Sequence, residues 1–183
     1  VDEDGLKRFE GTRRACCLNC DVYWEYSQKI VRAMAQALGT HPQLIGWQID
    51  NELGGHQTEA SFNEESRHDW HAWLKTKYGT IQRMNDLMGM RFWGQVVRDW
   101  SEVPMPMRAP TMHNPALVLD WRRFCSDTIV AFVRMQADLL RELTPERPVT
   151  TNLRAMTRQF DHFDVAEVLD FVSFDSNVAI HSR

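Results

Sequence analysis

The sequence predicts an α/β fold in which parallel strands alternate with helices, and two observations favour a barrel. Segments with helical periodicity alternate with short apolar runs of strand length, an order typical of parallel strands joined by right-handed crossovers. Three of the apolar runs end in polar residues, which are Asp50-Asn51-Glu52, Asn152 and Asp175. In a barrel such strand ends converge on one mouth. Because no glycine-rich phosphate loop follows any of them, a (β/α) barrel is favoured over a nucleotide-binding doubly wound sheet.

The first half of the chain predicts a helix, a strand and two further helices. Apolar residues recur at three- and four-residue steps over about 22–38, and Gly39 follows as a stop signal, which predicts an amphipathic helix. The residues of this stripe are Tyr23, Tyr26, Ile30, Met34 and Leu38. The apolar run 44–49 suits a strand buried on both faces. Helical patterns over about 62–78 and 80–88 complete this half.

The second half of the chain begins with a loop and contains the longest helix. Four prolines lie within 99–115, and they predict an extended loop over the surface that separates elements rather than domains. The apolar pattern over about 115–143 predicts the longest helix, which ends before Pro145. Two short strands are predicted at 148–152 and 169–175, with a mixed segment between them that suits a small helix.

Composition indicates a chain that folds around a core and excludes two classes of partner. Of 183 residues, 43% are hydrophobic and 25% charged, as in ordinary globular domains. The net charge is −4 without a basic run, so we expect no nucleic-acid partner. Charges interrupt every apolar stretch before the roughly 20 residues that a membrane span needs, so we expect no membrane partner and a cytoplasmic location. The opening VDEDG is typical of the interior of a longer protein.

Glu52, at the end of WQIDNE, is the strongest candidate for chemistry. A carboxylic acid that ends a buried strand is costly unless it has a partner or a role. A partly desolvated Glu52 could protonate a glycosidic oxygen, while the Asn51 amide could bind a sugar hydroxyl. The alternative is that Glu52 caps the next helix or pairs with Arg13 or Arg14. Asp175 could face the substrate or support a neighbouring arginine.

Eight stretches of the sequence form a specific pattern through their order and spacing. They are VDEDG, GTRRACC, THPQLIGWQIDNELG, WLKTKYGT, FWGQ, NPALVLDWRRFCSD, TPERPVTTN and LDFVSFD. Together they resemble the glycoside hydrolase family 42 β-galactosidases nearly end to end. The resemblance implies that residues 1–183 are the central strands and helices of one catalytic (β/α)8 TIM barrel domain, without an internal domain boundary. It also implies retaining removal of terminal β-D-galactose, with Glu52 as the general acid/base, Arg13 and Asn51 holding the sugar, and Trp93 as an aromatic wall.

A retaining mechanism also needs a nucleophilic carboxylate roughly 5 Å from the acid. In the family this residue ends a strand later than the one matching LDFVSFD, so we expect it beyond Arg183 and expect the 183-residue chain alone to be inactive. Open sheet edges would also make the isolated piece poorly soluble. The resemblance implies a β-galactoside substrate and a homotrimeric parent protein. Two alternatives remain, a retaining glycosidase for another β-linked sugar and a carbohydrate-binding relative without catalysis.

The cysteine pattern departs from the family. Many members hold a structural zinc with four cysteines, and Cys17 matches the first of them. The positions that match the other three are Ser61, Asn63 and Ser66. We therefore expect no cofactor and no structural zinc, since a hydroxyl or amide is a poor zinc ligand. A substitute site would draw on His56, His68 or His71. Met88 stands where the family usually shows tryptophan.

Overall fold

The computed structural model describes residues 1–9, 11, 16–154, 158 and 160–175, which fall into two compact units. Unit 1 is Val1–Cys20 with Ala60–Cys125, and unit 2 is Asp21–Glu59 with Ser126–Arg183. The residues of the long helix α4 (Pro115–Leu143) are divided between the two units. Because each unit draws on two separated stretches, neither is a consecutive segment joined by a linker. Among the described residues, no helix combines the length and hydropathy that a membrane span requires.

The helices of unit 1 begin and end at recognisable capping residues. Its elements are α2 (Glu64–Tyr78), α3 (Ile81–Leu87), the short 3-10 turns η2 (Phe92–Gly94) and η3 (Trp100–Glu102), and the first turns of α4. The Asn63 side chain accepts from the Ser66 N–H at the start of α2, and Thr80 caps α3 in the same way. Gly79 ends α2 at φ 73°, which a residue with a Cβ adopts only with strain. The helices predicted over 62–78 and 80–88 are therefore confirmed.

Tryptophan packing between α2 and the first turns of α4 forms the core of unit 1. The Trp70 ring is fully buried and lies 5.4 Å from Trp121 and 5.6 Å from Phe124, measured between centroids. The prediction of a surface loop over 99–115 is wrong in part, because Val103 and Met105 are buried in this core. In the extended backbone, alternate residues face opposite sides, so the exposed Pro104 lies between two buried side chains.

Unit 2 contains the parallel strands. Its elements are α1 (Asp21–Leu38), β1 (Trp47–Gln48), η1 (Gly55–Gln57), the remainder of α4, β2 (Val149–Thr150), β3 (Asn152–Arg154), α5 (His162–Ala166) and β4 (Ser173–Asp175). β1 pairs with β2 in parallel, and β3 pairs with β4 in parallel. Only Thr151 separates β2 from β3, so the segment 149–154 pairs with β1 through one half and with β4 through the other. Spatial neighbours are thus successive in the chain, as in a barrel.

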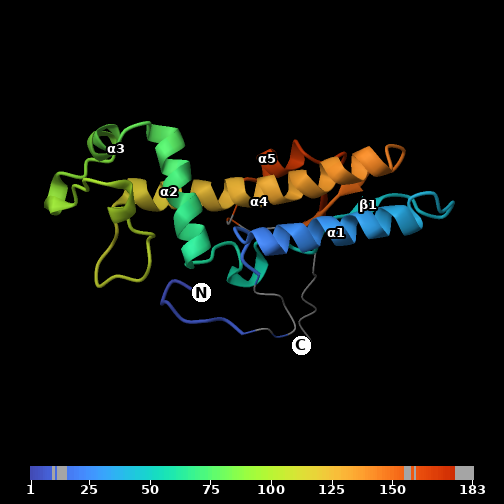
Figure 1. Ribbon diagram of the computed structural model, residues 1–183, viewed down its shortest axis with the longest axis horizontal. Helices are drawn as coiled ribbons and strands as arrows, with labels where there is room; N and C mark the ends of the chain where they lie inside the picture. Colours follow the sequence, from blue (N-terminus) through green and yellow to red (C-terminus); the bar gives the residue numbers. More distant parts are fainter. Residues whose placement is uncertain (10, 12–15, 155–157, 159, 176–183) are drawn as a thin grey trace, which may run out of the picture. The chain divides into compact units, whose positions relative to one another are not determined.

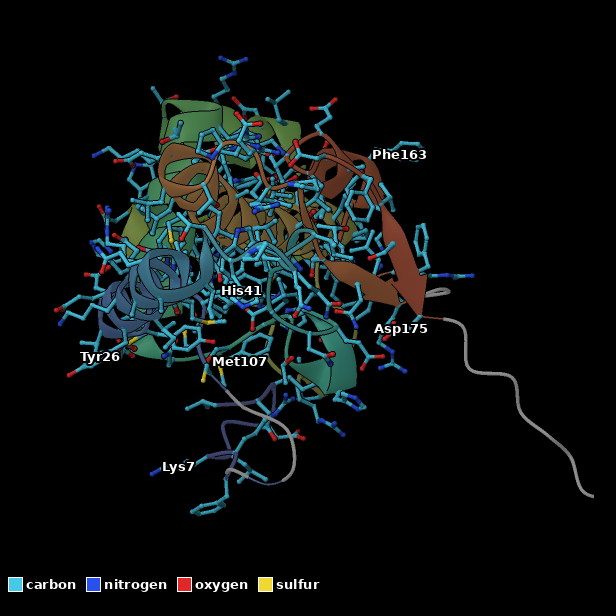
Figure 2. All side chains as sticks on the ribbon, turned by 90° about the vertical axis from the view of Figure 1, so that its right-hand side faces the viewer. Lys7, Tyr26, His41, Met107, Phe163 and Asp175 are labelled. Carbon is cyan, nitrogen blue, oxygen red and sulfur yellow. The ribbon has the colours of Figure 1, made fainter. Side chains whose placement is uncertain are left out.

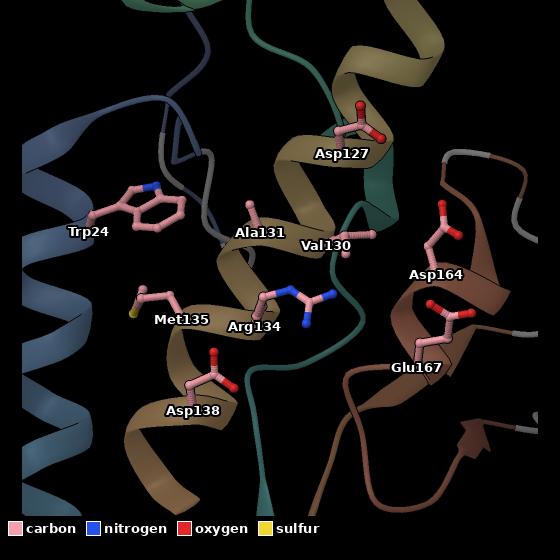
Figure 3. A pocket seen from close by; sticks show the side chains of 9 residues that line it. All are labelled: Trp24, Asp127, Val130, Ala131, Arg134, Met135, Asp138, Asp164 and Glu167. Carbon is pink, nitrogen blue, oxygen red and sulfur yellow. The ribbon is translucent and has the colours of Figure 1, made fainter. Parts of the chain in front are cut away.

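Helices α1 and α4 run side by side in unit 2 (Figures 1 and 3). The Tyr23 ring stacks on Phe132 at 5.4 Å, and the Trp24 ring meets the same phenylalanine edge-on at 5.5 Å. Phe132 has no exposed surface, and neither has Val149 on β2. The ring contacts cover the side of α4 that carries Phe132.

Two burial predictions in unit 2 are wrong. The helix over 22–38 is confirmed as α1, but its stripe from Tyr26 to Leu38 is exposed, and the buried residues are Ser27, Val31 and Ala35. Small side chains on that face allow close helix packing, which the periodicity of the larger apolar residues does not reveal. The run 44–49 forms only the two-residue strand β1, and Ile45, which precedes it, is 89% exposed.

An ion pair secures the beginning of β2 against the segment before β4. The Asp170 carboxylate accepts from the Val149 N–H at 2.7 Å and from Arg141 Nη2 at 3.0 Å. The Val149 N–H, and to a smaller extent the Arg141 guanidinium, lowers the pKa of Asp170 below its ordinary value. The charged form of Asp170 therefore stabilises the contact between the start of β2 and the segment that precedes β4.

Gly39 ends α1 at a place with no room for a side chain. A Cβ at this position would lie 2.3 Å from Thr144 Cγ2 and 2.5 Å from the Ala35 carbonyl oxygen. Thr144 is held in place because its hydroxyl accepts from Trp47 Nε1 at 2.9 Å and donates to the Leu140 carbonyl at 2.8 Å. The contact cannot be relieved without losing one of these buried hydrogen bonds.

We therefore expect Gly39→Ala to lower the free energy of unfolding by about 1–3 kcal/mol through overpacking. The measurement is the urea midpoint of the full-length gene product. Gly11→Ala is the matched control, because no atom lies within 4 Å of a Cβ there, and it should change stability by less than about 0.5 kcal/mol. Equal losses at both positions would contradict the packing argument.

Candidate active site

Polar side chains from the three strand ends of unit 2 meet at one place, as the sequence predicts. The Asn152 amide, which is 7% exposed, lies at the centre. Its Nδ2 donates to Asn51 Oδ1 at 3.2 Å and to Asp175 Oδ2 at 2.8 Å. Its Oδ1 accepts from the Glu52 N–H and from Gln48 Nε2, both at 3.1 Å. We call these five residues the strand-end cluster, and Figure 2 shows Asp175 at the tip of β4.

The Glu52 carboxyl is largely buried, with 9% of its side chain exposed. Its Oε1 lies 3.7 Å from Arg154 Nε, and its Oε2 lies 3.7 Å from His56 Nε2. Both distances permit electrostatic attraction but exceed hydrogen-bond length. The next α-helix, α2, is capped at its start by the Asn63 side chain, so Glu52 is not the cap of that helix.

The backbone around Glu52 adopts an unfavourable conformation. Asp50 and Glu52 have φ values of 50° and 47°, in the left-handed region that non-glycine residues usually avoid. Each such residue costs about 1–3 kcal/mol and persists only where surrounding contacts hold it. One such contact comes from α4, where the buried Gln136 donates through Nε2 to Asp50 Oδ2 at 3.2 Å.

Sequence reasoning missed Gln136 and Arg154 as neighbours of the site. Gln136 could have been found, because it is an amide on the helix face that carries the buried Phe132, Val133 and Leu140. A polar residue on an apolar helix face needs a partner across the interface. Arg154 has no comparable signal, since an arginine near a strand end is common on any protein surface.

The remaining predicted sugar-binding residues are placed less completely. Arg13 and Arg14 lie outside the described residues. Trp93 belongs to unit 1, where it is 81% exposed within η2 and has φ 58° and ψ 24°. Its ring meets Phe92 edge-on at 5.7 Å. The role of Trp93 as an aromatic wall stays a prediction.

The residues near Cys17 do not fit a zinc site. Cys17 Sγ donates to Asn63 Oδ1 at 3.5 Å and lies 3.3 Å from Ser66 Oγ, so a hydrogen-bonded group brings together three of the four positions that the family pattern marks. One thiol with an amide and a hydroxyl is a poor donor set for zinc. The His71 Nε2 is engaged by the Val103 carbonyl at 2.8 Å. Within the described part of the chain, no group of three or more histidine, cysteine or acidic residues could hold a metal.

A separate pocket of about 520 Å³ lies among α1, α4 and α5 (Figure 3). Its lining residues are Trp24, Asp127, Val130, Ala131, Arg134, Met135, Asp138, Asp164 and Glu167. None of the strand-end cluster contributes to it, so it is not part of the candidate active site.

A family model described as β-galactosidase, that of glycoside hydrolase family 42, matches residues 1–182. The chain belongs to the glycoside hydrolase family 42 β-galactosidases. Curated members include β-galactosidase LacZ of Heyndrickxia coagulans, 35% identical over 176 residues, and β-galactosidase of Thermus thermophilus, 37% identical over 176 residues. These alignments cover 96% of this chain and 26% and 27% of the relatives, so the chain spans about a quarter of their length.

Solved structures of family 42 enzymes have the same fold. The β-galactosidase from the psychrophilic Marinomonas ef1 gives a TM-score of 0.93 at 38% identity, covering 96% of this chain and 27% of that one. The enzyme of Halorubrum lacusprofundi gives 0.93 at 36% identity, with 96% and 26% covered. These similarities confirm the predicted fold class, an α/β TIM barrel of which this family 42 chain forms a part.

Proposed function

We propose that the protein is a retaining β-galactosidase and that this chain carries its general acid/base, Glu52. Family membership supports the reaction class. The observation that supports the residue is a carboxyl with 9% side-chain exposure at the end of a parallel strand, where barrel enzymes place catalytic groups. The neighbouring Asn51 amide supplies a hydrogen-bonding group beside the acid, held by Asn152.

In the first step Glu52 donates its proton to the glycosidic oxygen while the bond from that oxygen to the anomeric carbon breaks. A second carboxylate attacks the anomeric carbon and forms a glycosyl-enzyme. The family resemblance assigns this nucleophile to a strand later than β4. In the second step the Glu52 carboxylate takes a proton from water, whose oxygen displaces the enzyme carboxylate and releases the sugar with its original configuration.

The surroundings of Glu52 suit this cycle. When the proton has left, the carboxylate has two cation-forming side chains at 3.7 Å, Arg154 and His56. Both side chains can therefore stabilise the negative charge of the carboxylate. We assign Asn51 and Arg13 to sugar hydroxyls and Trp93 to the apolar face of a sugar ring, since planar donors and an indole face suit those groups.

A panel of nitrophenyl glycosides tests the proposal on the full-length gene product. We expect the highest kcat/KM for the β-D-galactoside, with β-galactose as the first product seen by NMR. A higher kcat/KM for another β-linked sugar would change the assigned substrate and leave the proposed mechanism unchanged. Binding without turnover by any member of the panel would favour the carbohydrate-binding alternative and overturn the enzymatic proposal. A homotrimeric assembly and a cytoplasmic location remain predictions.

We also propose that the family zinc is absent from this protein and that hydrogen bonds replace it. Treatment of the full-length gene product with a strong chelator should leave its Tm unchanged, because the hydrogen bonds of Cys17 and Ser66 need no metal. Cys17→Ser, which replaces the thiol donor by a hydroxyl donor, should also change the free energy of unfolding little, within about 0.5 kcal/mol. One bound zinc per chain by elemental analysis, lost together with thermal stability, would contradict this.

A further inference from the structure

We propose that Asn152 is a positioning residue for catalysis, which orients Glu52 and Asn51 without touching the substrate. The inference rests on the proposed function of Glu52 as the acid/base. An asparagine amide offers two N–H donors and an oxygen with two lone pairs. Asn152 uses all four. Its two N–H groups donate to Asn51, which follows β1, and to Asp175, the last residue of β4. Its oxygen accepts from the Gln48 side chain and from the Glu52 N–H. Its orientation is therefore fully determined.

The bond to Asn51 decides which end of that amide is presented to a ligand. Asn51 Oδ1 accepts from Asn152 Nδ2 at 3.2 Å, so the oxygen is turned toward Asn152. The Asn51 NH2 group is then the end left to donate to a sugar hydroxyl oxygen. Without the donor on Asn152, the Asn51 amide would lose the contact that distinguishes its two orientations.

The bond to Glu52 acts on its backbone. The Glu52 N–H donates to Asn152 Oδ1 at 3.1 Å, and Glu52 has the left-handed φ of 47°. Since this conformation persists only where contacts hold it, loss of the bond would let the backbone relax toward ordinary φ values and shift the carboxyl. A displacement of about 1 Å in a catalytic group lowers the rate about 10²-fold.

An isosteric change at Asn152 is the sharpest test. Asn152→Asp places a second carboxylate against Asp175, so repulsion moves the side chain at 152 away from the Glu52 N–H that it holds, and the change also removes the donor to Asn51. In the full-length gene product we expect kcat/KM to fall about 10²-fold for galactosides with poor leaving groups and much less for dinitrophenyl galactoside, with a displaced pH profile. A merely structural role of Asn152 would lower kcat/KM for all substrates alike.

The double variant Asn152→Asp with Asp175→Asn separates the two roles and guards against failure to fold. It restores the hydrogen bond between positions 152 and 175, with the donor now at 175 and the acceptor at 152. Stability and the wild-type dependence of kcat/KM on the leaving group should therefore return. The donor to Asn51 is still missing, so KM should stay raised roughly fivefold to tenfold.

Thr151→Val is the matched control, because Thr151 is 1% exposed and donates to the Ile49 carbonyl at 2.6 Å without joining the strand-end cluster. It should lose stability without altering the leaving-group dependence. The proposal is overturned if Asn152→Asp lowers kcat/KM equally for all substrates or has the same effects as Thr151→Val. It is also overturned if the loss of kcat/KM from Asn152→Asp adds in full to the loss from Glu52→Ala. Unchanged activity of Glu52→Ala alone would instead refute the proposed function, so the two failures are distinguishable.

Discussion

Replacement of Glu52 by alanine is expected to lower kcat/KM for galactosides with poor leaving groups by about 10²–10⁴-fold, the usual contribution of a general acid. Dinitrophenyl galactoside needs no proton for departure, so its first step should be spared. The second step would lack its general base, so a glycosyl-enzyme should accumulate and produce a burst. Stopped-flow measurement of nitrophenolate release from the full-length gene product distinguishes the two steps.

Added azide provides an independent readout for the same variant. Azide needs no general base, so it should restore turnover of activated substrates and yield a β-galactosyl azide. Glu59→Gln is the matched control, because Glu59 is an acid seven positions along whose Oε2 has no hydrogen-bond partner among the described residues. Retention of full activity by Glu52→Ala on unactivated galactosides would refute the assignment.

Replacement of Asp120 by alanine is expected to lower the free energy of unfolding by about 3 kcal/mol. The Asp120 carboxyl is 3% exposed in unit 1 and binds the Lys77 ammonium, the Tyr78 hydroxyl at 2.5 Å and Arg123 Nη1 at 3.1 Å. Removal of one partner leaves the others buried without compensation, which costs about 3–5 kcal/mol. The lower figure applies because Lys77 and Arg123 are 32% and 55% exposed and regain water.

Urea unfolding of the full-length gene product measures this loss, and tyrosine titration reports the same network. Burial, together with the hydrogen bond and charge of Asp120, raises the pKa of Tyr78 above its ordinary value. Asp120→Asn removes the charge, so the pKa of Tyr78 should fall while the loss of stability stays smaller than for alanine. Asp138→Ala is the surface control, since its side chain is 64% exposed. A loss from Asp120→Ala no larger than that control would contradict the prediction.

The helix bounds followed from local signals. The long helix occupies 115–143 as predicted. Helices α2 and α3 begin directly after Asn63 and Thr80, whose short polar side chains cap free N–H groups. The motif at Asn51-Glu52 was equally readable, because charge at the end of an apolar run is visible in the sequence. The buried face of α1 could not be predicted from the sequence, because it depends on how closely α4 approaches Ser27 and Ala35.

Local order along the chain thus determined the helices, the parallel arrangement of the strands and the identity of the candidate acid. The tertiary structure alone decided how that acid is held. Asn152 lies 100 positions from Glu52 and 101 from Asn51, and only the pairing of neighbouring strands brings these residues together. Register between strands results from packing over the whole unit, so no local pattern reveals that one amide holds both residues in place.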